Sequence, residues 1–252
     1  MRKRGQVLIG VRRRAVGGSA VRWWVGPGRA QPLGGRLWSA WTTTAYRGVM
    51  GRKRGFDEIE VLDVVRDRFW GTGYEGTSTY DLMDATGLGK GSIYKAFGNK
   101  RELYVRVFAD YCRDLVAQAR EQLRSGSDAV PAAPLARLER YLLSIAAAFA
   151  AESPHRGCFL TKGTSDLAGE DAEVARIARR AFDDLAAAFA AVIREAQDAG
   201  EVADQVDSTA LGYLLLSVIR GVDSLAKADV DGSTLERTVR CAMALIPPPS
   251  GD

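Results

Sequence analysis

The 252-residue sequence predicts an all-α fold, and three observations support this prediction. Apolar residues recur at three- and four-residue spacing from about residue 56 to residue 245, which is the period of one buried face of an α-helix. Ser, Asp and Asn stand just before these runs and Gly just after them, where helices are capped and ended. No stretch alternates apolar and polar residues as a half-buried strand does.

Composition narrows the classes of function. Apolar residues make up 46% of the chain, so a sizeable core is expected. The three cysteines, Cys112, Cys158 and Cys241, are widely spaced, which fits a reducing cytoplasm without disulfides or a zinc cluster. His155 is the single histidine, which argues against a histidine-ligated metal and a His-based triad. We expect no metal, no cofactor and no membrane span, because no run of about 18 apolar residues occurs.

Charge is unevenly distributed along the chain. Residues 1–49 hold ten Arg and Lys and no acid, a net charge of +10. Residues 50–120 hold twelve basic and eleven acidic residues, or +1, and residues 121–252 hold thirteen basic and twenty acidic residues, or −7. This layout indicates one part that approaches phosphate and an acidic part that stays away from it.

Residues 1–49 do not resemble the rest of the chain. They are rich in Arg, Gly and Trp without a sustained period, so we expect a basic, poorly ordered extension. One interpretation is an arm that adds non-specific DNA affinity. The favoured one is a mis-assigned start, with Met50 as the true first residue before the basic residues 52–54.

The first helix is predicted to begin at Asp57, an N-cap with Glu60 three residues on. It should end near Gly71 and Gly73. The residues that recur at helical spacing, and that we expect to face the core, are Ile59, Leu62, Val65 and Phe69.

Two short helices joined by a tight turn follow. Ser78 and Asp81 have the spacing of a capping box, and Gly87 stands where the helix must stop. The second helix should span residues 90–97. Asn99 then caps a third, longer helix that continues to about residue 124.

The outward side of this motif, at about residues 78–97, is basic and small. Four cations and no acid lie between Thr86 and Arg101, and Gly91 and Ser92 leave the start of the second helix bare. Such a helix fits a major groove, with lysines and hydroxyls on phosphates. The residues predicted to contact DNA are Thr77, Ser78, Lys90, Gly91, Ser92, Tyr94, Lys95 and Lys100.

This motif resembles the DNA-binding signature of the TetR/AcrR family of transcriptional regulators. The residues that carry the resemblance are Gly87, Leu88, Lys90, Gly91, Ser92, Ile93, Tyr94, Phe97, Asn99, Lys100, Glu102 and Leu103. It implies a three-helix helix-turn-helix DNA-binding domain at 50–111 and a helical ligand-binding and dimerisation domain at 112–252. It also implies a sequence-specific repressor that a small molecule releases from its operator. Gly89 departs from the pattern, since a small hydroxyl residue usually stands there.

Two long helices are predicted at about residues 171–199 and 207–228. The second is apolar around most of its circumference, which indicates burial on two sides, inside the subunit and against a partner. The resemblance implies a homodimer through these helices. Two recognition helices would then read the half-sites of a palindromic operator in double-stranded DNA.

Cys158 is a candidate sensor, together with Phe159 and Lys162. Arg156 precedes the thiol, a helix start is near and Lys162 follows four residues on, a setting that favours a reactive thiolate. The alternative is a small buried core residue, which is the usual position of a free cysteine.

Two other functions remain possible from the sequence. A non-specific DNA-compacting protein would use the basic residues 1–49, and deleting them would remove most of its affinity. A small-molecule enzyme is disfavoured because no nucleophile, base and acid occur in a recognisable set, so we expect no catalytic residues.

Overall fold

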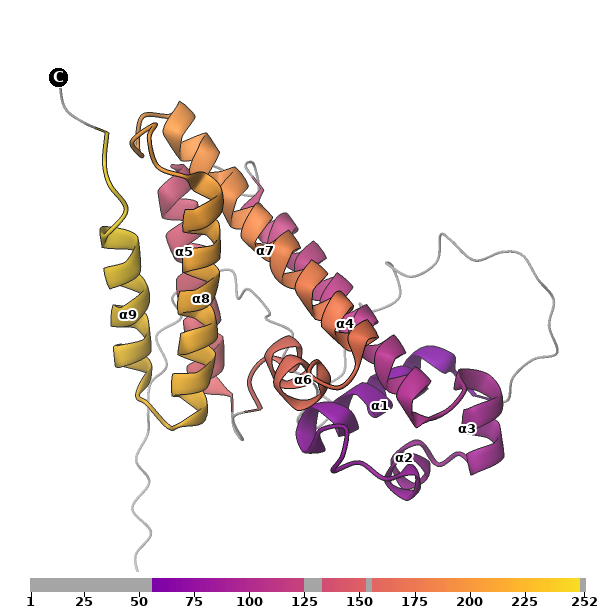
Figure 1. The fold of residues 1–252 in the computed structure, drawn as a ribbon. Helices are drawn as coiled ribbons and strands as arrows, with labels where there is room; N and C mark the ends of the chain where they lie inside the picture. The colour runs from indigo at the N-terminus through magenta and orange to yellow at the C-terminus, as the bar shows by residue number, and fades with distance from the viewer. Residues whose placement is uncertain (1–55, 125–132, 153–155, 250–252) are drawn as a thin grey trace, which may run out of the picture.

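The computed structural model describes residues 56–124, 133–152 and 156–249, and within these ranges it contains α-helices and no strand (Figure 1). The all-α fold is therefore confirmed. The predicted extension at 1–49 lies outside the described residues. The helices are α1 (Glu58–Thr72), α2 (Thr79–Thr86), α3 (Lys90–Phe97), α4 (Lys100–Leu123), α5 (Pro134–Ala151), α6 (Phe159–Leu167), α7 (Ala172–Asp198), α8 (Ser208–Lys227) and α9 (Gly232–Ala244).

Helices α1, α2 and α3 gather at one end of the molecule around the beginning of α4 (Figure 1). The prediction that Ile59 faces the core is wrong, because 62% of its side chain is exposed. Helix α1 instead buries Val61, Val65 and Phe69, which recur at four-residue spacing, while Leu62 is half-buried. The buried side chains of this small core are Val61, Val65, Phe69, Leu82, Ile93, Phe97 and Leu103.

The predicted caps fix this small core in place. Both capping boxes are present, from Ser78 to Asp81 at α2 and from Asn99 to Glu102 at α4. Gly87 ends α2 with φ +68°, a left-handed conformation that favours glycine. Gly89 is the N-cap of α3 and provides no side-chain hydrogen bond to it.

Helix α4 connects this end to a larger helical body (Figure 1). Further along, α4 packs against α5, α6 and α7, and α5 packs against α7, α8 and α9. Helix α6 is short and lies where the body meets α1 (Figure 1). The two parts of the molecule are therefore joined by α4 and by the contacts of α6.

Helices α7 and α8 form the most extensive helix pair of the body and approach each other closely at Gly212. A Cβ at this position would lie 2.5 Å from the Ala186 carbonyl oxygen and 3.2 Å from the Ala190 amide nitrogen. These are backbone atoms, so the helices would have to separate.

We expect Gly212→Ala to lower the free energy of unfolding by about 1–3 kcal/mol, the usual cost of overpacking. Gly71→Ala is the matched control, because Gly71 also lies in a helix, α1, and no atom lies within 4 Å of a Cβ there. It should be neutral or stabilising by up to about 1 kcal/mol, since alanine is the better helix former. Urea unfolding of both variants measures the difference, and equal effects would contradict the packing argument.

By length and composition α8 alone among the described helices could also cross a membrane, although no apolar run in the sequence predicted one. It packs against α5, α7 and α9, as the core helix of a helical body does. One such helix is weak evidence for a membrane.

Candidate nucleic-acid interface and ligand cavity

Helix α3 buries one face and presents another that is small and basic. Ile93 and Phe97 are buried in the small core. Lys90, Gly91, Ser92 and Lys95 are exposed on the opposite side. No protein atom lies within 4 Å of a Cβ built at Gly91, so the start of the helix is open to an approaching surface.

Tyr94 is half-buried and links α3 to α2. Its hydroxyl lies 2.6 Å from the hydroxyl of Thr79, in the first turn of α2. The ammonium of Lys90 lies 5.7 Å from the centre of its ring. Tyr80 follows Thr79 in the same turn and exposes 79% of its side chain, a prominent aromatic group that the sequence analysis did not single out.

The predicted phosphate contact by Thr77 is wrong for this structure. The residue is fully buried, its hydroxyl donates to the Gly73 carbonyl at 2.7 Å, and it lies 2.6 Å from the Thr72 hydroxyl. A threonine before a capping box can point inward or outward, and the tight turn after α1 decides in favour of inward.

Ser78 and Lys100 remain at the surface but already have partners. The Ser78 hydroxyl donates to the Asp81 carboxylate at 2.7 Å and accepts from the Asp81 amide at 3.2 Å. The Lys100 ammonium lies 4.2 Å from the centre of the Tyr74 ring, a cation–π contact. Lys100 is the first residue of α4, three positions after the last residue of α3.

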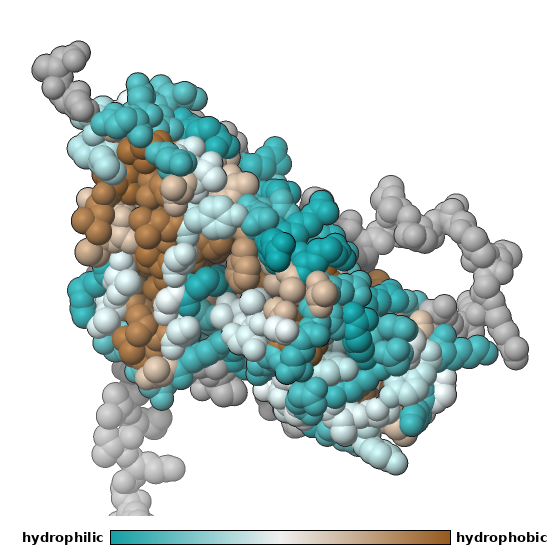
Figure 2. All heavy atoms as spheres, viewed as in Figure 1, coloured by the Kyte–Doolittle hydropathy of each residue, from teal (hydrophilic) through white to brown (hydrophobic). Residues whose placement is uncertain are grey.

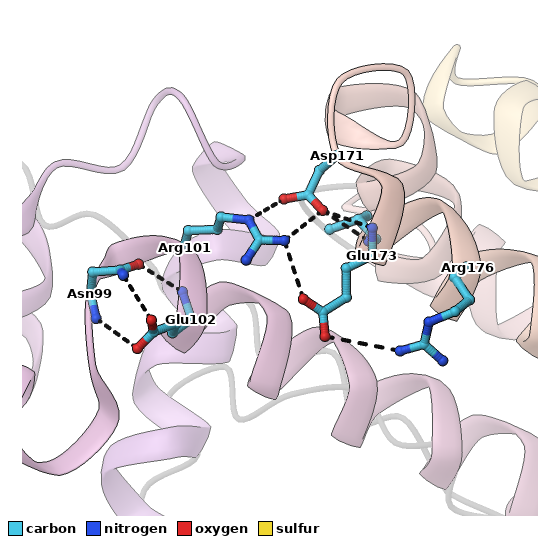
Figure 3. A network of polar contacts seen from close by, with 7 residues as sticks. Asn99, Arg101, Glu102, Asp171, Glu173 and Arg176 are labelled. Carbon is cyan, nitrogen blue, oxygen red and sulfur yellow. Dashed lines mark hydrogen bonds and ion pairs between the residues drawn. The ribbon is translucent and has the colours of Figure 1, made fainter.

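Arg101 connects the first turn of α4 to the start of α7 (Figure 3). Its Nε and Nη2 donate to the two carboxylate oxygens of Asp171 at 2.5 and 2.9 Å, and Nη2 also reaches Glu173 at 3.2 Å. Asp171 caps α7 by accepting from the amides of Glu173 and Val174. The hydrogen bonds from Arg101 lower the pKa of Asp171, against the effect of burial and with help from the Val174 and Glu173 amides.

This lowered pKa has a defined effect on stability. A carboxyl group whose pKa is lower in the folded state stabilises the fold above its unfolded pKa of 3.8, and this contribution is lost as the pH falls through the folded value. We expect Asp171→Asn, which keeps the cap but loses the ion pair, to unfold about 1 kcal/mol more easily at pH 7.

The same substitution should flatten the acid side of the stability curve. The difference between Asp171→Asn and the unchanged protein should shrink as the pH falls below about 4, measured as urea unfolding at stepped pH. Asp204→Asn is the control, because the Asp204 side chain is exposed and its carboxylate forms no ion pair or hydrogen bond with the described residues. A difference between Asp171→Asn and the unchanged protein that stays constant with pH would contradict the assignment.

A cavity of about 610 Å³ lies between α1, α4, α5, α7 and α8. This volume is in the range of small-molecule sites. No three His, Cys, Asp or Glu of the described ranges gather to hold a metal. The cavity is lined by the apolar and aromatic residues Trp70, Leu115, Tyr141, Ile145, Ala148, Phe149, Leu185, Phe189, Leu216 and Ile219, and by Asp63, Arg66, Tyr111, Asp114, Gln118, Glu152, Gly157, Cys158 and Arg220.

Cys158 lines this cavity, but its neighbours differ from those predicted. Arg156 lies over the Trp70 ring at 4.5 Å and Lys162 pairs with Asp166 at 3.2 Å, so neither is directed to the thiol. The Cys158 Sγ lies 3.5 Å from the Tyr111 hydroxyl, and Arg220 of α8 is the neighbouring cation. The sequence could not place Arg220 there because 62 residues separate it from Cys158.

Phe159 and Lys162 do not line the cavity. Phe159 is fully buried among aromatic rings, with Tyr111 at 5.5 Å and Phe108 at 5.5 Å between ring centres. Its position makes it part of the core under α6. The interpretation of Cys158 as a small buried residue also fits, since 3% of it is exposed.

Trp70, near the end of α1, joins the cavity to the helix-turn-helix end of the molecule. Its indole Nε1 donates to the Gly157 carbonyl at 2.9 Å, and its ring lies 5.3 Å from that of Tyr111. Because Trp70 also lines the cavity, a molecule bound there touches the same helix that packs against α2. The sequence signal was weak, since the residue stands beside the periodic Phe69.

A second hollow of about 720 Å³ lies between α4 and α7. Its cations are paired: Arg113 with Asp110 at 2.6 Å and Arg120 with Asp184 at 2.7 Å. An ion-paired surface gains little from a further charged ligand. The cavity beside Trp70 is therefore the better candidate for a ligand.

Comparisons with known proteins agree with both ends of the structure. Residues 53–107 match the family described as "Bacterial regulatory proteins, tetR family", and residues 134–242 match "Tetracyclin repressor-like, C-terminal domain". The HTH-type transcriptional repressor ComR of Escherichia coli is 27% identical over 201 residues, which is 80% of this chain and 92% of that protein. The uncharacterised HTH-type transcriptional regulator YezE of Bacillus subtilis is 26% identical over 198 residues, 78% of this chain and all of that protein.

Solved structures show the same arrangement. A cysteine-substituted form of the TetR family regulator CifR, complexed with 26-bp operator DNA, has a TM-score of 0.67 at 26% identity, over 78% of this chain and 100% of that one. Reduced NemR of E. coli has a TM-score of 0.68 at 16% identity, over 77% and 98%, and shows the shared fold. With a helix-turn-helix end, a helical body and matches to both parts of the family, this chain belongs to the TetR family of DNA-binding transcriptional regulators.

Proposed function

We propose that the protein is a homodimeric repressor that binds a palindromic operator and is released from it by a small molecule. The observation that carries this proposal is the position of Trp70, which belongs both to the helix-turn-helix end and to the wall of the cavity. The repressor ComR and the operator complex of CifR support it.

DNA contact is assigned to the open side of α3. Gly91 and Ser92 would allow close approach, Lys90 and Lys95 would hold phosphates beside the groove, and Tyr94 would fix α3 against α2. Ser78 and Lys100 remain candidates for phosphate contact at the flanking helix starts. The division into a DNA-binding part at 50–111 and a ligand-binding part at 112–252 would fall inside α4.

The dimer is assigned to α8 with α9. The large exposed apolar side chains there are Tyr213, Leu214, Leu225 and Leu245, and Figure 2 shows hydrophobic residues gathered over this part of the body. The exposed positions of α7 carry mainly charged residues such as Arg176 and Arg180. The proposed interface therefore keeps α8 but replaces α7, which the sequence had predicted, by α9. An apolar patch of this kind marks a protein interface.

We further propose that the protein has no catalytic activity and acts in the cytoplasm, where its DNA target lies. A cavity lined mostly by apolar side chains fits binding without turnover. An assay for turnover of any compound that binds would oppose this assignment if product formed.

Operator binding tests the proposal. The full chain and a fragment of residues 50–252 are titrated against the DNA upstream of the chain's own gene, in rising salt and with competitor DNA. A specific regulator keeps its shift with competitor in both forms. Binding that competitor removes, or that is lost with residues 1–49, would instead favour the DNA-compacting alternative.

Cys158→Ser tests the sensor hypothesis separately. The sensor hypothesis states that the thiol reacts with an electrophile such as N-ethylmaleimide and that this reaction releases DNA. The serine variant should then keep operator binding but need at least about tenfold more electrophile for release, because a hydroxyl is a far weaker nucleophile than a thiolate. Cys241→Ser is the control, since Cys241 is exposed and lies outside the cavity. An unchanged response in Cys158→Ser would leave the residue as part of the core.

A further inference from the structure

Arg220 brings a positive charge into the body of the protein without a carboxylate in contact. Its Nη1 donates to the Thr161 hydroxyl at 3.0 Å, and its Nε is closed off from solvent without a hydrogen-bond partner. No Asp or Glu among the described residues forms a salt bridge with it within 4.0 Å. The residue is half-buried and also interacts with Cys158, but a guanidinium partly removed from water without a carboxylate partner still favours the arrival of an anion.

Asp223 is not the anionic partner of Arg220. The residue is fully buried one turn along α8, and its Oδ1 accepts from the Cys158 amide at 3.2 Å. Its nearest cation is Lys227, at 3.7 Å. Asp223 does not line the cavity, whereas Arg220 does.

Arg220 stays charged where it lies. Burial opposes the charge, but the neighbouring Cys158 and Asp223 favour it and hold the pKa of Arg220 above its ordinary value. Burial also raises the pKa of Tyr111, with a further contribution from Cys158, so its hydroxyl remains a donor at neutral pH. Tyr111 and Arg220 thus place a neutral donor and a cation on the wall of one cavity.

The rest of the wall is mainly apolar, and its other charged residues are ion-paired: Asp63 with Arg66, Asp114 with Arg113, and Glu152 with Arg156. Ile145, Phe149, Leu185, Phe189 and Leu216 come from α5, α7 and α8 and offer no charge to a ligand. A molecule that suits both regions has one anionic head and an apolar or aromatic body.

We propose that the effector of this protein is an apolar monocarboxylic acid, its carboxylate held by Arg220 and Tyr111 and its body packed between α5, α7 and α8. This inference rests on the proposed ligand-responsive function and adds the chemical class of the ligand. A guanidinium binds a carboxylate through two parallel hydrogen bonds, which neither an amide nor an ester can accept equally well.

The test compares acids with neutral partners of the same shape. Decanoate and 4-phenylbutanoate are titrated against decanamide and 4-phenylbutanamide on the full-length protein without DNA, by calorimetry and by the shift in unfolding temperature. The acids should bind about tenfold to a hundredfold more tightly than the amides, the value of a hydrogen-bonded charge. Equal affinities, or no binding by either acid, would overturn the class.

Variants locate the effect at Arg220. Arg220→Met, of similar length without the charge, should bind acid and amide alike, and Arg220→Lys should keep a weaker preference for the acid because it loses the paired geometry. Arg179→Met, on the exposed side of α7, should behave as the unchanged protein. If Arg220→Met does not fold, the Lys variant carries the test, and an unaltered acid preference in it would oppose bidentate binding.

Operator release separates this inference from the function on which it rests. If acids bind through Arg220 but do not release DNA, the proposed ligand class is supported and the proposal of a ligand-released repressor is contradicted. If only neutral compounds release DNA, the proposed ligand-released repressor is supported and the proposed class of effector, an apolar monocarboxylic acid, is overturned.

Discussion

Gly91→Glu is expected to abolish specific operator binding while leaving the fold intact. Gly91 is exposed in the first turn of α3, and no atom lies within 4 Å of a Cβ built there. The glutamate therefore has room within the protein. It also favours the helix, because glutamate is a better helix former than glycine and its charge lies near the positive helix N-terminus.

The same side chain would meet DNA with bulk and negative charge. Against a phosphate backbone these effects should reduce operator affinity by at least about a hundredfold. Fluorescence anisotropy with operator DNA measures the affinity, and urea unfolding checks that the free energy of unfolding is unchanged or higher by up to about 1 kcal/mol.

Gly71→Glu is the matched control for charge. Gly71 is exposed near the end of α1, and a Cβ there also meets no atom within 4 Å. The variant carries the same net charge as Gly91→Glu but changes a site away from the exposed side of α3. Equal loss of affinity in both variants would mean that overall charge, and not the start of α3, governs DNA binding.

Trp70→Phe is expected to keep operator binding and to weaken the response to the effector. The phenyl ring retains most contacts with Tyr111 and Phe159, but the hydrogen bond from the indole Nε1 to the buried Gly157 carbonyl is lost. An unpaired buried carbonyl costs about 1–3 kcal/mol. The segment before α6 would then hold α1 less firmly, so a ligand in the cavity would move α1 less.

Trp70→Ala should have the larger effect on stability, about 3–5 kcal/mol, because it removes a buried ring as well. Thermal unfolding and the effector concentration needed for half-release of operator DNA measure both effects. Thr164→Val is the control, since it removes a hydrogen bond within α6, from the Thr164 hydroxyl to the Leu160 carbonyl, without touching α1. A normal effector response in Trp70→Phe would show that the coupling takes another route, for example through Arg101 and Asp171.

Signals within a few residues of each other were enough to predict the helices of the helix-turn-helix end. The capping boxes at Ser78 and Asn99 and the glycine stop at Gly87 involve residues within three or four positions of each other, so their geometry follows from the adjacent chain. Periodicity failed at Ile59, which is exposed although its spacing suits the core. The face that a helix buries depends on where its neighbours lie, and in α1 the neighbours are α2 and α4.

The sequence by itself determined the all-α fold, the approximate bounds of α1 to α4, α7 and α8, and the small basic start of α3, because caps, periods and side-chain types act over a few residues. Only the tertiary structure decided that Thr77 points inward, that Trp70 donates to Gly157 and that Arg220 stands beside Cys158. These contacts join residues of different helices. Their existence depends on how α1, α6 and α8 pack, and that arrangement is fixed by the sum of many buried contacts that no local pattern encodes.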